Sequence, residues 1–263
     1  MIFDLHVNQS LVGNDELMQF ARAIDGGPFH TLWVLDHFAS LQEDAQHAML
    51  DPFVLLGALA TQTKTVNIGV LVANVVNRLP AVLAQAATSL QYMSNNRFSL
   101  GLGAGAAPTS QFAAEHHSLG IGLQAKMSDR HAYLHNSVQA IRAVWQRSNN
   151  ETPRIVQPST EPPITIGVNS ARLAELAAQM NCAVNIRWNH EDLTSILAAY
   201  QNEARKCNTQ SNISIWMPWD TQHTNNPSYL DSFSELGVDR VIFLTTQAQH
   251  FTEIKQLGNF SFP

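Results

Sequence analysis

The residues with the clearest capacity for chemistry are Asp36 and His37, which directly follow the apolar run 31–35 (TLWVL). A histidine titrates near neutral pH, so its side chain can act as a general acid, a general base or a hydrogen-bond donor to a reacting ring. A histidine at the end of a strand can equally be held by hydrogen bonds and take no part in a reaction. The pair marks a candidate catalytic site with both interpretations open.

Small residues end the apolar run 97–103, where Gly101, Gly103 and Gly105 alternate with larger residues. The spacing fails the Gly-x-Gly-x-x-Gly dinucleotide motif, because Ala106 stands where the third glycine is required. Two interpretations remain. The glycines leave space for a flat ring to lie against the backbone, or they serve packing within the sheet.

Two other strand ends carry groups suited to a phosphate. The first closes the apolar run 163–168 and leads into a helix through Gly167, Val168, Asn169 and Ser170. Free N–H groups and the helix dipole favour an anion there, although Asn and Ser are also ordinary N-cap residues. The second is Arg187 at the end of the run 183–187, which suits a cofactor phosphate, a substrate or a neighbouring carboxylate.

One pair of histidines has a spacing that could suit a metal site. His131 and His135 lie four residues apart on a predicted helix, so both rings can face the same way, as helical zinc ligands do. The His-Glu-x-x-His motif needs a glutamate where Ala132 stands, and the sequence offers no identifiable third ligand. We therefore predict no metal site.

These candidate residues must be positioned by strands and helices that alternate along the chain. Apolar, β-branched runs predict strands at 2–8, 31–35, 66–72, 97–103, 163–168, 183–187, 212–217 and 239–244. Amphipathic stretches predict helices near 14–25, 51–62, 79–93, 129–146, 170–180, 190–206, 228–236 and 249–257. Residues 104–127 and 147–162 are predicted to be long loops.

Eight strand–helix units in 263 residues predict one α/β domain over residues 1–263, a (β/α)₈ TIM barrel. The strands are mostly continuous apolar runs, as in a parallel sheet covered by helices. A doubly wound sheet also uses alternating units, but the count and the length favour the barrel. In a barrel the active site lies at the carboxyl ends of the strands, where all the candidate residues above stand.

Composition restricts the partners. The net charge is −6 and the isoelectric point is about 6.0, so we expect neither nucleic acid nor an anionic membrane as a partner. No apolar run approaches the roughly 18 residues of a membrane span, and the first residues do not resemble a signal peptide. Cys182 and Cys207 stand far apart and suggest no disulfide framework. We expect a cytoplasmic protein.

Residues 30–106 resemble the luciferase-like family of flavin- and deazaflavin-dependent oxidoreductases. The resemblance is carried by Leu32-Trp33-Val34-Leu35-Asp36-His37-Phe38, by Asp51-Pro52 with 59–63 (LATQT) and 66–70 (VNIGV), by 80–90 (PAVLAQAATSL), by 94–98 (SNNRF) and by the glycines of 101–105 (GLGAG). The family fold is a barrel, which agrees with the units counted above.

The resemblance implies roles for particular residues. His37 would be the proton donor or hydride-transfer partner, and Asp36 would contact the cofactor. A non-proline cis peptide bond between Leu71 and Val72 would prop the ring. The remaining implied cofactor contacts are Ala73 at the same strand end, Gly103, Gly105 and the segment Gly167, Val168, Asn169 and Ser170, which would receive the phosphate.

The implied cofactor is coenzyme F420 or FMN, with a slight preference for coenzyme F420 because Asp36-His37-Phe38 matches the deazaflavin-using branch. The implied activity is hydride transfer to or from a small organic substrate. A homodimer through the helices after the second and third strands is also implied.

Two departures from the family pattern keep alternatives open. Ala106 replaces an acidic residue that the family often carries, and the chain is short around the seventh strand. One alternative is an FMN-dependent two-component monooxygenase that is fed by a separate flavin reductase. The other is a non-catalytic flavin-binding barrel.

Overall fold

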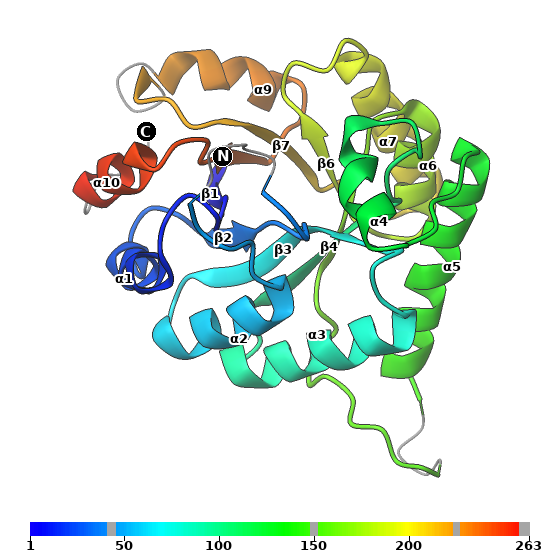
Figure 1. Cartoon of the computed structure of the whole chain (residues 1–263). Coiled ribbons are helices and arrows are strands. Elements are labelled where there is room, and N and C mark those ends of the chain that lie inside the picture. The colour runs from blue at the N-terminus through cyan, green and yellow to red at the C-terminus, as the bar shows by residue number, and fades with distance from the viewer. Residues whose placement is uncertain (41–45, 148–151, 223–226, 258–263) are drawn as a thin grey trace.

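The computed structural model describes residues 1–40, 46–147, 152–222 and 227–257. Within these residues eight parallel strands form a closed barrel in chain order, in which each strand pairs with the next and β8 pairs with β1. Figure 1 shows the helices arranged around the outside of this sheet. The predicted (β/α)₈ barrel is confirmed, and the doubly wound alternative is wrong because that sheet would be open.

All the predicted strands are present, with ends that differ by at most two residues from the expected ones. They are β1 (Ile2–Val7), β2 (Thr31–Val34), β3 (Asn67–Asn74), β4 (Phe98–Gly103), β5 (Ile164–Gly167), β6 (Ala183–Arg187), β7 (Ile213–Pro218) and β8 (Arg240–Leu244).

The predicted helices are also present. They are α1 (Asn14–Ile24), α2 (Pro52–Gln62), α3 (Pro80–Ser94), α5 (Met127–Trp145), α6 (Ala171–Gln179), α7 (Leu193–Lys206), the pair η2 (Pro227–Leu230) and α9 (Asp231–Glu235), and α10 (Gln249–Gln256). The start of α2 follows from its sequence: the Asp51 carboxylate accepts hydrogen bonds from the N–H groups of Phe53 (2.9 Å) and Val54 (3.1 Å), and Pro52 takes the first helical position.

The long connection 104–127 is not irregular throughout. It contains the 3₁₀ helix η1 (Gln111–Ala113) and the short helix α4 (Ala114–Ser118). In the second predicted loop, 147–162, residues 148–151 lie outside the described residues. No helix within the described ranges is long and apolar enough to cross a membrane.

Alternation along each strand separates two sets of buried side chains. Leu32 and Val34 belong to the main core between the sheet and the helices, whereas Trp33 lies with Leu71 and Ile242 in a second, smaller cluster inside the barrel. At the amino ends of the strands, polar side chains fill the interior of the barrel. The most important is the fully buried carboxylate of Asp4, which accepts a hydrogen bond from the Trp33 indole at 2.8 Å and pairs with Arg240 at 2.6 Å.

We expect Gly101→Ala to destabilise the barrel, because an added Cβ would overlap the carbonyl oxygen of Val70 and lie 3.0 Å from Leu71 Cδ1. A backbone oxygen cannot move aside without displacing β3, so we expect a loss of about 1–3 kcal/mol in the free energy of unfolding. Denaturant unfolding measures this loss. The matched control is Gly122→Ala, where an added Cβ meets no atom within 4 Å. Equal stability of the two variants would contradict the packing described for β3 and β4.

Candidate active site

The candidate residues gather at one end of the barrel. They lie at or just after the carboxyl ends of β2 to β6, and these strands are consecutive and parallel, so their carboxyl ends share one rim. The ends are also connected directly, since the Asp36 carboxylate accepts a hydrogen bond from the backbone N–H of Asn74 at 2.9 Å, and Asn74 is paired with Gly103 in the sheet. The predicted common rim is therefore present.

Asp36 is buried, and its carboxylate accepts hydrogen bonds from several donors. Arg78 Nη1 lies 2.9 and 2.8 Å from its two carboxylate oxygens, and the Asn77 amide donates to it at 3.3 Å. Burial raises the pKa of Asp36, and the neighbouring Arg78 guanidinium opposes that shift. The second Arg78 nitrogen, Nη2, reaches Asp51 at 2.5 Å. Asp36 thus joins the ends of β2 and β3, and its direct contact with a cofactor stays a prediction.

His37 is held by a carboxylate that sequence reasoning did not identify. Its Nδ1 lies 2.9 Å from Glu115 Oε1, while Glu115 Oε2 accepts hydrogen bonds from the backbone N–H groups of Phe38 (2.8 Å) and Ala39 (3.2 Å). The side chain of His37 is 21% exposed and that of Glu115 only 8%. Although Ala106 leaves no acid at the expected position, a carboxylate does reach the rim from α4.

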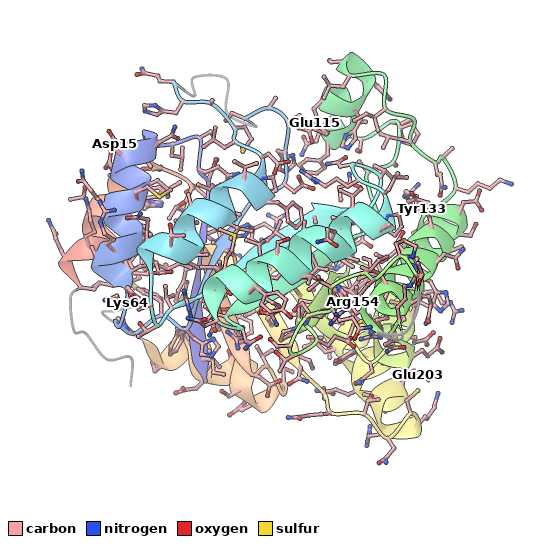
Figure 2. The ribbon with its side chains drawn as sticks, turned by 90° about the horizontal axis from the view of Figure 1, so that it is seen from below. Asp15, Lys64, Glu115, Tyr133, Arg154 and Glu203 are labelled. Carbon is pink, nitrogen blue, oxygen red and sulfur yellow. The ribbon has the colours of Figure 1, made fainter. Side chains whose placement is uncertain are left out.

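Figure 2 places Glu115 and Asp15, which lies in the helix after β1, toward the same edge of the molecule, and Lys64, which precedes β3, farther from that edge. This is the edge at which the strands end.

A second residue of α4, His116, is buried with its Nε2 lying 2.9 Å from Asn77 Oδ1 and 3.0 Å from Asn74 Nδ2. Helix α4 is therefore attached to the ends of both β2 and β3.

A further histidine, His6 on β1, lies inside the barrel. It is 6% exposed, and its Nε2 is buried and makes no hydrogen bond within the part of the chain that the structure describes. Burial and, to a smaller extent, the nearby His37 lower the pKa of His6 to about 3, while hydrogen bonding to the backbone of Val34 and Leu71 acts in the opposite direction. His6 is therefore neutral at neutral pH and carries an unpartnered polar nitrogen.

The glycines at the ends of β4 and β5 accommodate one side chain. A Cβ at Gly103 would lie 2.7 Å from Val72 Cγ2, and a Cβ at Gly167 would lie 3.2 Å from Val72 Cγ1. The bond between Leu71 and Val72 is a non-proline cis peptide, as the resemblance implied. The position of Val72 supports the packing interpretation, and a cofactor contact at Gly103 and Gly167 stays a prediction. A flat ring at this position would meet Val72 rather than bare glycine backbone.

The other predicted site residues on β3 and after β4 lie in different surroundings. Leu71 lies in the cluster inside the barrel. Ala73 is fully buried in the main core, so its side chain faces the helices and not the rim. Gly105 has a φ of 86°, and a Cβ there would lie 3.1 Å from Asn74 Oδ1.

The predicted phosphate-binding residues lie at the ends of β5 and β6. Val168 is buried in the core, Asn169 is exposed, and Ser170 is the N-cap of α6, with its hydroxyl oxygen 3.4 Å from the Leu173 N–H. Arg187 is exposed, and its guanidinium carbon lies 5.8 Å from the centre of the Trp216 ring. Ser170 therefore fulfils the N-cap role considered above, and phosphate binding remains a prediction.

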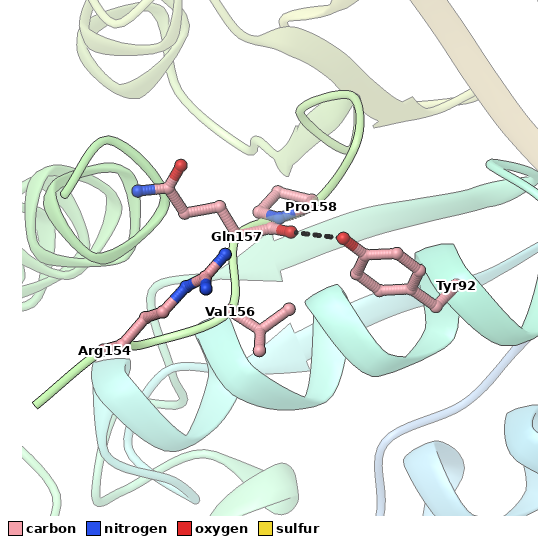
Figure 3. Close-up of a pocket in the computed structure, with 5 residues that line it drawn as sticks. All are labelled: Tyr92, Arg154, Val156, Gln157 and Pro158. Carbon is pink, nitrogen blue, oxygen red and sulfur yellow. Dashed lines mark hydrogen bonds between the residues drawn. The ribbon is translucent and has the colours of Figure 1, made fainter. Parts of the chain in front are cut away.

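Two other features are not part of the cluster described above. In the described residues no three His, Cys, Asp or Glu side chains are grouped so as to hold a metal ion, and the pair His131 and His135 has no third ligand there. A cavity of about 260 Å³ lies beside α3 (Figure 3) and is lined by Tyr92, Arg154, Val156, Gln157 and Pro158. Tyr92 is near the carboxyl end of α3, which leads into the amino end of β4, so this cavity lies away from the rim.

The site residues that sequence reasoning did not assign are His6, Asn77, Arg78, Glu115 and His116. One of them had a recognisable signal. Arg78 is the only charged residue between positions 65 and 96, and it stands just after the third strand. Glu115 and His116 had none, because their partners lie 39 to 78 residues away and α4 is too short to show a helical pattern.

Comparisons with known proteins agree with this geometry. The family model described as luciferase-like monooxygenase matches residues 2–211. Among curated relatives, an F420-dependent glucose-6-phosphate dehydrogenase of Amycolatopsis mediterranei is 31% identical over 52% of this chain and 39% of its own length. The oxygenase component of a flavin-dependent trigonelline monooxygenase of Acinetobacter baylyi is 24% identical over 73% of this chain and 54% of its own.

A solved structure of similar fold is an F420-dependent secondary alcohol dehydrogenase in complex with an F420-acetone adduct. It aligns with a TM-score of 0.79 at 14% identity, over 97% of both chains. The chain thus spans about half the length or less of the two curated relatives and nearly the whole of this fold neighbour.

We expect His6 to make the stability of the protein depend on pH. The unfolded chain binds a proton at this histidine near its ordinary pKa of 6.5, whereas the folded protein does so only near 3. Between these values the unfolded state binds more protons, so the free energy of unfolding decreases as pH falls, by about 1.4 kcal/mol per pH unit from this residue. Urea unfolding from pH 6.5 to 4.5 should show a shallower decrease for His6→Gln than for the wild type. Equal slopes would mean that the folded protein already protonates His6.

Proposed function

Because the chain belongs to the luciferase-like monooxygenase family, we propose that it is an oxidoreductase that uses coenzyme F420 or FMN to transfer a hydride to or from a small organic molecule. The two curated relatives support these cofactors, since one is F420-dependent and the other flavin-dependent. Each is matched over only part of its length, so neither relative's substrate is transferred to this chain.

The observation that carries the proposal is the environment of His37. The ring stands at the rim with its Nδ1 engaged by Glu115 at 2.9 Å, which leaves Nε2 as the nitrogen available to a bound molecule. The side chain is partly exposed, so a ligand at the rim can reach it. A histidine in this state can take up or release one proton at Nε2 while the hydride moves elsewhere.

The residues at the rim fit a flat heteroaromatic cofactor with a phosphate-bearing tail. His6 has a buried, unpartnered Nε2 that would be satisfied by a polar edge of a ring. Val72 would support one face of the ring, because it lies over Gly103 and Gly167. The start of α6 and the exposed Arg187 are suited to the phosphate. The bound cofactor supplies the hydride chemistry, and the protein orients it.

A second candidate is an FMN-dependent monooxygenase that receives reduced flavin from a separate reductase. The trigonelline relative favours it, because its name identifies it as an oxygenase component. The Asp36-His37-Phe38 sequence keeps coenzyme F420 slightly ahead.

Titration of the purified protein with coenzyme F420 and with FMN tests the proposal. We expect one of the two to bind, seen as quenching of its fluorescence. We expect His37→Ala to leave the dissociation constant within tenfold of the wild-type value, about 1.4 kcal/mol, because the ring acts on the reacting group. The same variant should abolish cofactor reduction or oxidation with whichever small organic substrate the wild type accepts. Binding of neither cofactor would refute the proposed function and favour the non-catalytic barrel.

We also propose that the protein is a homodimer through α2 and α3. The two helices pack side by side on the outside of the barrel (Figures 1 and 2) and contain no charged residue. They and the residue before α3 expose large apolar side chains to solvent, namely Val54 (75% exposed), Leu79 (69%), Val82 (52%), Tyr92 (54%) and Met93 (49%). An uncharged apolar surface of this kind is typical of an interface between subunits.

We expect the double variant Val54→Asp, Val82→Asp to be monomeric, because two buried, unpaired carboxylates would oppose association. Sedimentation velocity should show a dimer for the wild type and a monomer for the variant, with unchanged circular dichroism. Met127→Asp, at an equally exposed residue on α5, is the matched control and should remain dimeric. A monomeric wild type would contradict this interface.

A further inference from the structure

We propose that Glu115 is a positioning residue for His37, whose carboxylate keeps the proton of the neutral ring on Nδ1 and turns an unprotonated Nε2 toward the rim. The effect on turnover rests on the proposed function. The effect on the ring does not, since it follows from contacts within the protein.

The carboxylate is held at both oxygens. Oε1 faces His37 Nδ1 at 2.9 Å, and Oε2 accepts two backbone hydrogen bonds, from Phe38 at 2.8 Å and Ala39 at 3.2 Å. These N–H groups belong to the two residues after His37, so the carboxylate and the ring are fixed to the same short segment. The plane of the carboxylate is therefore set by the backbone that carries the histidine.

A carboxylate has no hydrogen to donate, so the shared hydrogen must come from Nδ1. In the neutral ring the other nitrogen, Nε2, then carries a lone pair and acts as a base or an acceptor. The side chain of Glu115 is only 8% exposed, so water competes little for this hydrogen bond. Glu115 thus selects the tautomer of the neutral ring.

Helix α4 does not depend on Glu115 alone for its place at the rim. His116 is buried and attaches α4 to the end of β3 through Asn74 and Asn77. Changing the carboxylate of Glu115 should therefore alter the environment of His37 without releasing α4.

The test is Glu115→Gln, which keeps the size of the side chain and can accept the Phe38 and Ala39 hydrogen bonds. Its amide NH₂ then faces the histidine and donates to Nδ1, which favours the Nε2–H tautomer. We expect ¹⁵N NMR of the ring nitrogens, assigned with His37→Gln, to show Nδ1–H in the wild type and mainly Nε2–H in the Glu115→Gln variant. The control is Glu203→Gln on α7, a carboxylate paired with Lys206 far from the rim, and its spectrum should match the wild type.

Kinetics provide the second measurement. We expect Glu115→Gln to reduce kcat at least tenfold, with KM and the cofactor dissociation constant within about twofold of the wild type, because the substituted group does not touch the ligand. An Nε2–H ring in the wild type would overturn the proposal even if the variant failed to fold, and so would an unchanged tautomer in the variant. Failure of both cofactors to bind would refute the proposed function while leaving the NMR result decisive for Glu115.

Discussion

The rim of the barrel depends on one partly buried guanidinium. Arg78 follows β3 and contacts Asp36 after β2 and Asp51 before α2, and it also lies 4.9 Å from the centre of the Phe53 ring. Removing one member of such a pair leaves a buried charge without its partner, which typically costs about 3–5 kcal/mol. Because Asp36 is adjacent to His37, the position of the histidine depends on this ion pair. The acidic residue beside the candidate catalytic group is thus explained by structure, with no need for a role in the reaction.

The buried polar groups named here at the two ends of the barrel differ in their hydrogen bonding. At the amino ends of the strands, Asp4 is fully buried and is satisfied by Arg240 and the Trp33 indole. Toward the carboxyl ends, the buried Nε2 of His6 and Nδ1 of His116 make no hydrogen bond within the described residues. An unsatisfied buried polar group costs about 1–3 kcal/mol. Under the proposed function, a polar edge of the bound cofactor would remove this cost at His6.

The barrel could be predicted from the sequence because its information is local. Each strand is a short apolar run and each long helix a periodic one, so the pattern within about ten residues decides the element. For the site, the sequence predicted only that the candidate residues stand at the ends of strands, and not which residues contact them. The Asp36–Arg78 pair joins residues 42 apart and the His37–Glu115 contact residues 78 apart, and nothing near either residue shows such a partner. The glycines of β4 show the same limit, because flat-ring binding and packing require the same small residue. Only the position of Val72 separates the two interpretations.

The two histidines near the rim differ in what they can do. His6 is buried, and its pKa of about 3 keeps it neutral over the physiological range, so it offers a fixed hydrogen-bonding nitrogen. His37 stands partly exposed against a carboxylate that lies 2.9 Å from its ring. A positive charge on His37 also opposes a second charge on His6, since each ring lies within the electrostatic reach of the other. Under the proposed function, His37 would therefore transfer the proton, and His6 would hold a ligand without changing its own charge. One histidine suits the reacting group and the other suits the part of the ligand that must stay still.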